Sequence, residues 1–207
     1  MALRTIVGAM LALAIAGSPA LACQGEEIYS DDFADDSGMW GDPPDWMKIG
    51  GGSMELKLQP GYRGIAFFRG GQQKEFDVCV DITYPEAKKP DGGTVAGIAF
   101  WFKDWENHYV VGTTPVGAVG AYRYNKDKLA LQSPFRSNPA VKGGAGAQNT
   151  FRVTVKGNAI TIYANDQRIA GFRGTPEEAW MGLYAESEQD NSNAWKFSNF
   201  RLTEAPK

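Results

Sequence analysis

Alternating apolar and polar side chains mark short stretches along most of the chain, and turn-forming residues separate these stretches. The alternation is clearest over residues 53–58, 75–84, 149–155 and 159–164. A period of two places every second side chain on one face of a β-strand, while glycine, asparagine and aspartate between the stretches favour tight turns. About a dozen such stretches, with no long helical pattern, predict an all-β sandwich of two antiparallel sheets.

The segment 97–112 predicts a central hairpin of this sandwich. Its two apolar runs flank a polar turn that precedes His108, the only histidine of the chain. Strand alternation divides the first run into two faces. With one of these faces in the core, Trp101 and Lys103 on the other are expected to point towards a ligand. The expected core face holds Ile98, Phe100 and Phe102, and the expected outer face holds Ala99, Trp101 and Lys103.

The first 22 residues have the composition of a secretory signal peptide. Arg4 precedes a short apolar run, and the small residues Ala20 and Ala22 lie just before the expected cleavage. The apolar run is too short to cross a bilayer. The chain is therefore expected to consist of a signal peptide, residues 1–22, and one domain, residues 23–207. The domain is expected in the periplasm or outside the cell, with no transmembrane segment.

Cys23 and Cys79 are the two cysteines of the chain. Two cysteines in an exported protein favour a disulfide, which would pin the N-terminal segment to a strand. Cys23 would also be the first residue after cleavage, the place at which a lipid anchor is attached. Ala20 stands where a lipoprotein signal usually has leucine, so the anchor is the weaker alternative.

The charge balance and the absence of several motifs narrow the function. The chain has 24 acidic and 21 basic residues and a net charge of −3. A nucleic-acid surface needs a dense basic patch, so no nucleic-acid partner is expected. The sequence also lacks the G-x-S-x-G motif of serine hydrolases and a glycine-rich loop ending in Lys-Ser or Lys-Thr.

Several motifs in a fixed order resemble a known family. The chain opens with D-D-F-x-D-x-x-x-x-W at residue 31 and continues with G-I-x-F at residue 97 and N-H-Y at residue 107. N-T-F-R-V-T-V-K-G-N-x-I-T-I-Y-A-N-D begins at residue 149, and G-L-Y with W-K-F-S-N-F-R-L closes the pattern. The order resembles the concanavalin A-like jelly rolls, and most closely the bacterial 3-keto-disaccharide hydrolase-type domains. Ser198 stands where this family usually has aspartate.

The resemblance implies a jelly roll of two curved antiparallel sheets, in which a concave face often binds sugar and a calcium ion is sometimes present. A secreted, lectin-like and non-catalytic domain that binds a carbohydrate or a cell-envelope polysaccharide is the favoured hypothesis. A glycoside hydrolase or lyase acting on a glycoside or a 3-keto sugar is the first alternative. A structural envelope protein without a small ligand is the second.

Residues around the turn of the hairpin are candidates for catalysis and binding. His108 with Asp104 or Glu106 could remove a proton beside a keto group, because histidine titrates near neutral pH. Aromatic rings suit the apolar faces of sugars, and polar groups around the rings suit the hydroxyls. The expected substrate-binding residues are Trp101, Lys103, Trp105, Tyr109, Tyr122 and Arg123.

Two further groups of acids offer alternatives. Asp31, Asp32 and Asp35 lie in one turn and could hold calcium, which prefers oxygen ligands, although solvated acids are the simpler interpretation. Glu75 and Asp77 begin like the E-x-D-x-E strand of laminarinase-type hydrolases, but Cys79 occupies the third position. Glycoside cleavage with retention needs two carboxyls about 5–5.5 Å apart, and residues two apart on a strand are about 6.5–7 Å apart at the backbone, so an acid pair of Glu75 and Asp77 stays open. A solvated strand face opposite the core face is the favoured interpretation.

Overall fold

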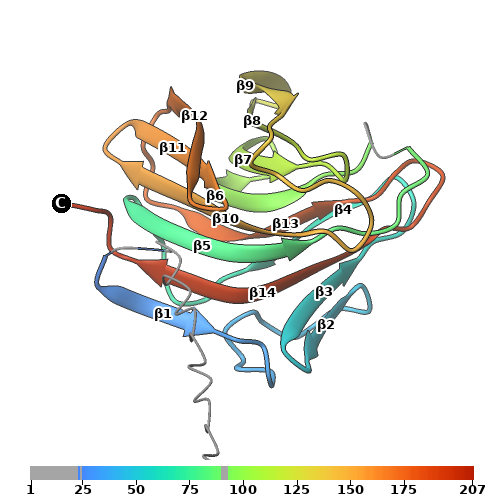
Figure 1. Cartoon of the computed structure of the whole chain (residues 1–207). Coiled ribbons are helices and arrows are strands. Elements are labelled where there is room, and N and C mark those ends of the chain that lie inside the picture. The colour runs from blue at the N-terminus through green and yellow to red at the C-terminus, as the bar shows by residue number, and fades with distance from the viewer. Residues whose placement is uncertain (1–22, 24, 90–92) are drawn as a thin grey trace, which may run out of the picture.

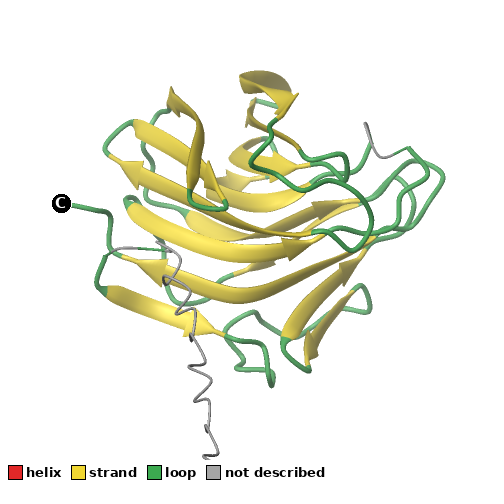
Figure 2. Cartoon of the chain, in the orientation of Figure 1, coloured by secondary structure: helices red, strands yellow, loops and turns green. Residues whose placement is uncertain are grey.

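The computed structural model describes residues 23, 25–89 and 93–207, and this part of the chain consists of strands and loops (Figure 2). The predicted signal peptide, residues 1–22, lies outside the described residues. The all-β prediction is confirmed: two antiparallel sheets pack against each other, as Figure 1 shows. In the described residues, no helix is long and apolar enough to span a membrane.

The larger sheet has the strand order β12-β11-β10-β5-β14-β3-β2, and β1 adds to it by pairing with β14. Strands distant in the sequence are neighbours, because β5 lies between β10 and β14. The bounds are β1 Glu27–Asp31, β2 Met47–Gly50, β3 Ser53–Lys57, β5 Phe76–Thr83, β10 Gln148–Lys156, β11 Ala159–Ala164, β12 Gln167–Arg173 and β14 Ala194–Thr203.

The smaller sheet has the order β4-β13-β6-β7-β8-β9. Strands β6 and β7 form the predicted central hairpin, and β13 lies on the other side of β6. The bounds are β4 Arg63–Phe67, β6 Ala96–Asp104, β7 Asn107–Thr113, β8 Ala118–Asn125, β9 Lys128–Ser137 and β13 Trp180–Glu186.

Alternation in the sequence explains how the sheets face each other. In β5, Phe76, Val78 and Val80 point into the core between the sheets, as the pattern of residues 75–84 predicts. Strand β14 contributes Trp195 and β6 contributes Ile98 to the same core. Burial of such side chains removes apolar surface from water and is the main force that holds the two layers together.

The outer faces of the two sheets differ in chemistry. The outer face of the larger sheet is polar: Asp77 and Arg152 form an ion pair of 2.7 Å there, and Lys196 lies 3.8 Å from Glu55. The outer face of the smaller sheet carries a second apolar cluster instead. Its buried members are Ile65, Ala99, Phe102, Val110, Tyr122 and Tyr184, with Phe67, Tyr124 and Phe135 packed against them. We call this surface the aromatic face.

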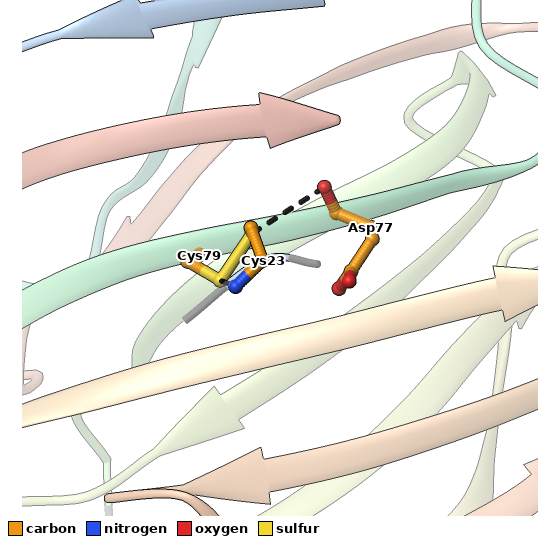
Figure 3. Close-up of side chains that lie close together, drawn as sticks. All are labelled: Cys23, Asp77 and Cys79. Carbon is orange, nitrogen blue, oxygen red and sulfur yellow. Dashed lines mark hydrogen bonds between the residues drawn. A yellow bond between two sulfur atoms is a disulfide. The ribbon is translucent and has the colours of Figure 1, made fainter. Parts of the chain in front are cut away.

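The predicted disulfide is confirmed: Cys23 and Cys79 are joined in the structure (Figure 3). Cys79 lies on the polar outer face of the larger sheet, on the side of β5 opposite to the core residues Val78 and Val80. The backbone N–H of Cys23 also donates a hydrogen bond to Cys79 Sγ, at 2.8 Å. Cys23 and Cys79 lie close to Asp77, which is fully buried.

A break in strand alternation overturns one expectation. The β6–β7 pairing shifts between Phe100 and Asp104, and Trp101 has a φ of 46°, in the left-handed region. Phe100 and Trp101 consequently both lie in the core, while Phe102 turns to the aromatic face. The prediction that Trp101 faces a ligand and Phe102 the core is wrong, because an irregularity of one residue reverses every side chain beyond it.

Candidate functional site

The aromatic face is built by alternation within β13 and β4. In β13, Met181, Leu183 and Ala185 enter the core, so the residues between them point outward. Trp180, Tyr184 and Glu186 are therefore on the aromatic face, and Trp180 is paired with Phe102 of β6. Trp180 remains 40% exposed and Trp105, in the β6–β7 turn, 41% exposed. Two large aromatic side chains are thus open to solvent on this face.

Glu186 is the half-buried carboxylate of this face. Tyr184 Oη donates a short hydrogen bond to Glu186 Oε1, and Tyr122 Oη donates a second one at 3.4 Å. Burial raises the pKa of the Glu186 carboxyl, and the two hydrogen bonds together with the positive charge of Arg63 offset part of that effect. The site therefore contains a carboxyl that holds its proton to a higher pH than an ordinary glutamate does.

Arg63 connects the carboxylate end of the face to its aromatic end. Its guanidinium lies 4.6 Å from the ring centre of Tyr124 and 5.2 Å from that of Trp105, which is the geometry of cation–π contacts. Arg63 also borders an open depression of about 390 Å³. The depression is lined by Asp45, Trp46, Lys57, Leu58, Gln59, Tyr62 and Arg63. The polar and aromatic surface therefore continues past the edge of the sheet.

His108 lies beneath this surface and is only 1% exposed. Its ring stacks on Tyr124 with 5.0 Å between centres and packs against Phe102 at 4.9 Å and Trp105 at 5.9 Å. Burial lowers the pKa of His108 to about 4, and the positive charge of Arg63 acts in the same direction. The imidazole is neutral at physiological pH and closed off from solvent, which does not suit the candidate role of a base that removes a proton from a bound sugar.

The polar turn next to His108 is solvent-exposed. Lys103, Asp104 and Glu106 are all exposed, so they do not form a closed pocket with the histidine. Asp104 Oδ1 accepts hydrogen bonds from the Glu106 backbone N–H at 2.9 Å and from Asn107 Nδ2 at 2.8 Å. These bonds close the turn in the way that aspartate commonly stabilises reversals. Asp104 thus has a structural role in the hairpin.

The remaining predicted binding residues lie on the core side of the smaller sheet. Trp101 is 2% exposed, and its Nε1 donates a hydrogen bond to the Lys74 carbonyl at 2.9 Å. Tyr109 is buried beside Trp101, and the Arg123 guanidinium lies 5.0 Å from the Tyr109 ring centre. These three residues therefore face away from the aromatic face, on which the structure brings together His108, Trp105 and Tyr122.

Sequence reasoning missed Tyr184 and Glu186. The signal was present, because residues 180–186 alternate in the same way as the other strands. Met181, Leu183 and Ala185 are the apolar set, so the pattern alone places Tyr184 and Glu186 together on the opposite face. What the pattern did not show is that Arg63 and Tyr122 come from strands far along the chain to meet them.

The E-x-D motif of β5 does not form an acid pair. Asp77 binds Arg152 through several hydrogen bonds, and Glu75 Oε1 accepts a hydrogen bond from the Gly157 backbone N–H at 2.9 Å. Both residues are on the polar outer face of the larger sheet, away from the aromatic face. The expectation that this face is simply solvated is wrong for Asp77, which is fully buried in its ion pair.

The acidic turn that begins at Asp31 is held by hydrogen bonds. Asp31 accepts them from the Phe33 backbone N–H, Trp40 Nε1, Tyr29 Oη and Ser37 Oγ. Burial alone would raise the pKa of the Asp31 carboxyl, but these donors lower it below its ordinary value. Asp32 accepts a hydrogen bond from the Ala34 N–H. In the described residues, Asp31, Asp32 and Asp35 do not come together as a metal-binding group, and the donors around Asp31 favour a loop-forming role over calcium.

Comparisons with known proteins concern the fold. Neither a protein-family model nor a curated protein sequence matches the chain. The carbohydrate-binding module CBM66 from Bacillus subtilis is 14% identical, with a TM-score of 0.59 over 73% of this chain and 86% of its own. A β-glucanase from Bacillus licheniformis is 11% identical, with a TM-score of 0.61 over 87% and 99%.

An endo-acting O-glycanase structure from the human gut microbiota is 10% identical, with a TM-score of 0.64 over 87% of this chain and all 100% of its own. At such identities a structural likeness establishes the fold and leaves the activity open. The two antiparallel sheets and these structural neighbours together show that the chain folds as a concanavalin A-like lectin/glucanase jelly roll.

Proposed function

We propose that this protein is a secreted, lectin-like domain that binds a carbohydrate on its aromatic face and does not cleave it. The observation that carries the proposal is the composition of that face. Trp105 and Trp180 are exposed there, and the polar groups of Arg63 and Glu186 lie among the rings. Structural neighbours named as a carbohydrate-binding module and as glycoside-cleaving enzymes have the same fold, which adds support to a saccharide as the ligand.

The chemistry of the face suits a saccharide. A sugar ring has apolar C–H faces that pack on tryptophan or tyrosine and hydroxyls that need charged or polar partners. Trp105 offers an aromatic surface with Arg63 beside it, while the Glu186 carboxylate accepts hydrogen bonds between Tyr184 and Tyr122. A cell-envelope polysaccharide could continue into the depression that Trp46 and Tyr62 line next to Arg63.

Binding without cleavage is favoured by the number of carboxyls. Hydrolysis of a glycoside usually requires one carboxyl as acid and a second as base or nucleophile. In the described residues, Glu186 is the carboxylate that hydrogen-bonds to the tyrosines of the face, while Asp104 and Glu106 lie in the exposed turn. This arrangement favours binding of the ligand over its cleavage.

The test is a glycan array followed by calorimetric titration of the best ligand with wild type, Trp105→Ala and Trp180→Ala. We expect each tryptophan variant to lose about tenfold or more in affinity, since a stacked aromatic ring contributes on the order of 1–3 kcal/mol. Tyr163→Ala is the matched control, because Tyr163 also lies 4.9 Å from an arginine, Arg152, but on the larger sheet. Binding by no glycan, or equal losses in the control, contradicts the proposal.

Glu186 favours one alternative, cleavage of a glycoside or a 3-keto sugar, the activity of the hydrolase-type domains that the sequence resembles. A carboxyl that keeps its proton at raised pH can act as a general acid. This alternative requires that Glu186→Gln abolish sugar release from a polymer that the wild type degrades. Release that continues undiminished in Glu186→Gln removes Glu186 from any catalytic role.

Export to the periplasm or the cell exterior is part of the proposal. The Cys23–Cys79 disulfide supports it, because such bonds persist in oxidising compartments. A lipid anchor on Cys23 would need the sulfur that the disulfide occupies. Mass spectrometry of protein purified from its natural cell separates the two, because a disulfide lowers the mass by about 2 Da and a lipid adds a large acyl group.

If no glycan binds, a structural role in the envelope becomes the better explanation.

A further inference from the structure

The side chain of His108 has one ring nitrogen without a partner. Nδ1 lies 3.2 Å from the Asp104 carbonyl oxygen, which can only accept a hydrogen bond. Nδ1 must therefore carry the proton of the neutral ring. Nε2 is left with a free lone pair, and no described residue donates a hydrogen bond to it although it is buried.

A buried acceptor without a donor is unfavourable, and most such groups in folded proteins have a partner. The groups around the ring do not provide one: Phe102 and Tyr124 present ring faces, and Trp105 meets His108 edge to face at 88°. Arg63 is the nearby cation, and its guanidinium lies over the rings of Trp105 and Tyr124. The acceptor is thus enclosed by aromatic groups on the surface that we assign to the ligand.

Trp105 is the part of this enclosure that can be displaced most easily. It lies in the turn between β6, which ends at Asp104, and β7, which begins at Asn107. Its side chain is 41% exposed, whereas Phe102 is only 6% exposed. A rotation of the indole needs no change in the sheet, because exposed side chains change rotamer rapidly.

We propose that Nε2 of His108 is the acceptor that recognises a ligand hydroxyl on the aromatic face, reached when the Trp105 indole moves aside. This inference rests on the proposed function and adds a rule of selectivity to it. The face would select neutral ligands that offer an O–H donor at this point, and it would discriminate against deoxy and O-methyl analogues, which leave the acceptor unpaired. His108 is then a specificity-determining residue for binding.

The first test uses the fact that the chain has a single histidine. In protein labelled with ¹⁵N-histidine, one pair of ring signals reports the tautomer and the hydrogen bonds of His108. We expect a protonated Nδ1 and a bare Nε2 in the free protein. Saturation with a soluble β-glucan, xylan or galactan oligosaccharide that binds by calorimetry should shift the Nε2 signal towards a hydrogen-bonded position. A proton on Nε2 in the free protein, or an unchanged signal at saturation, overturns the inference.

The second test uses His108→Phe, which keeps a ring between Phe102 and Tyr124 and removes the acceptor. We expect at least tenfold weaker affinity for the oligosaccharide. We also expect the wild type to discriminate against one deoxy analogue of that oligosaccharide by tenfold, and the variant to show no such preference. If the wild type and His108→Phe bind equally, this inference fails and the proposed function stands. If no oligosaccharide binds the wild type, both fail.

Discussion

At the scale of single residues, burial decides what the titratable groups of the aromatic face can do. His108 lies under Trp105, Phe102 and Tyr124 and has a pKa of about 4, while burial raises the pKa of Glu186. Both shifts favour the uncharged form, as expected where aromatic rings replace water. The aromatic surroundings of the two groups therefore disfavour charge on both side chains, which suits a neutral ligand.

His108→Phe should make stability less sensitive to acid. The folded-state pKa of about 4 is below the ordinary 6.5, so the unfolded chain binds more protons between these values. Stability from this group is complete above pH 6.5 and decreases as the pH falls towards 4. At about 1.4 kcal/mol for each pKa unit, the loss is about 3 kcal/mol. We expect His108→Phe to lack this loss in urea unfolding measured between pH 4 and pH 8.

The groups that face His108 do not obscure this comparison. Arg63 stays charged throughout that range, because its pKa is raised. The negative charge of Asp104 raises the pKa of His108, so its effect is already contained in the value of about 4. Parallel pH profiles for the wild type and the variant would show that His108 does not carry the shifted pKa.

At the scale of elements, alternation predicts most strands and fails where the backbone is irregular. Residues 53–58, 149–155 and 159–164 have the alternation that their burial in β3, β10 and β11 confirms. In β5 the apolar set enters the core as predicted, but Asp77 and Cys79 on the other face are buried as well. In β6 the irregularity after Phe100 places two consecutive aromatic residues in the core. The sequence Phe100-Trp101-Phe102 does not indicate this irregularity, because each of the three aromatic side chains can be accommodated on either face of the sheet. The assignment of Trp101 to a ligand was wrong for this reason.

Two tryptophans four positions apart should consequently respond to mutation in opposite ways. Trp101→Ala leaves a large cavity in the core and should cost about 3–5 kcal/mol in the free energy of unfolding, with ligand affinity unchanged in the fraction that folds. Trp105→Ala should cost less than about 1 kcal/mol, as surface substitutions generally do, and should weaken ligand binding about tenfold or more. Urea denaturation and calorimetric titration of both variants give the comparison. Equal losses of stability would contradict the irregular strand.

At the scale of the whole molecule, the sequence predicted the layers and the disulfide but not the meeting of strands at the site. The fold class followed from alternation and turns, and the pairing of Cys23 with Cys79 from their number. The site required Arg63, Tyr122 and Glu186 to converge from β4, β8 and β13. Such convergence depends on the order of the strands in the sheet. One sequence does not reveal that order, because strands with the same alternation can pair in many different orders.

The disulfide should stabilise the molecule as a whole without acting on the aromatic face. It joins residues separated by 56 positions, and closing a loop of this length restricts the unfolded chain. We expect the double variant Cys23→Ser/Cys79→Ser to lose roughly 2–4 kcal/mol in the free energy of unfolding. Its ligand affinity at low temperature should equal that of the wild type. A reducing agent should destabilise the wild type and leave the double variant unchanged, which serves as the control.

The position of Cys23 also determines from which side the domain can be attached to a tag or a solid support. Cys23 lies against Cys79 of β5, and the chain that follows runs beside the end of β14, where the Glu204 N–H donates to the Glu26 carbonyl at 2.9 Å. Cys23, through its disulfide, and the last strand are thus both attached to the larger sheet, while Trp105 and Trp180 lie on the aromatic face of the smaller one. A tag or a resin attached beside Cys23 or after the last strand would approach the larger sheet. The tryptophans would then remain turned outward, and the protein could be immobilised on a sensor surface with its aromatic face open to a polymer in solution.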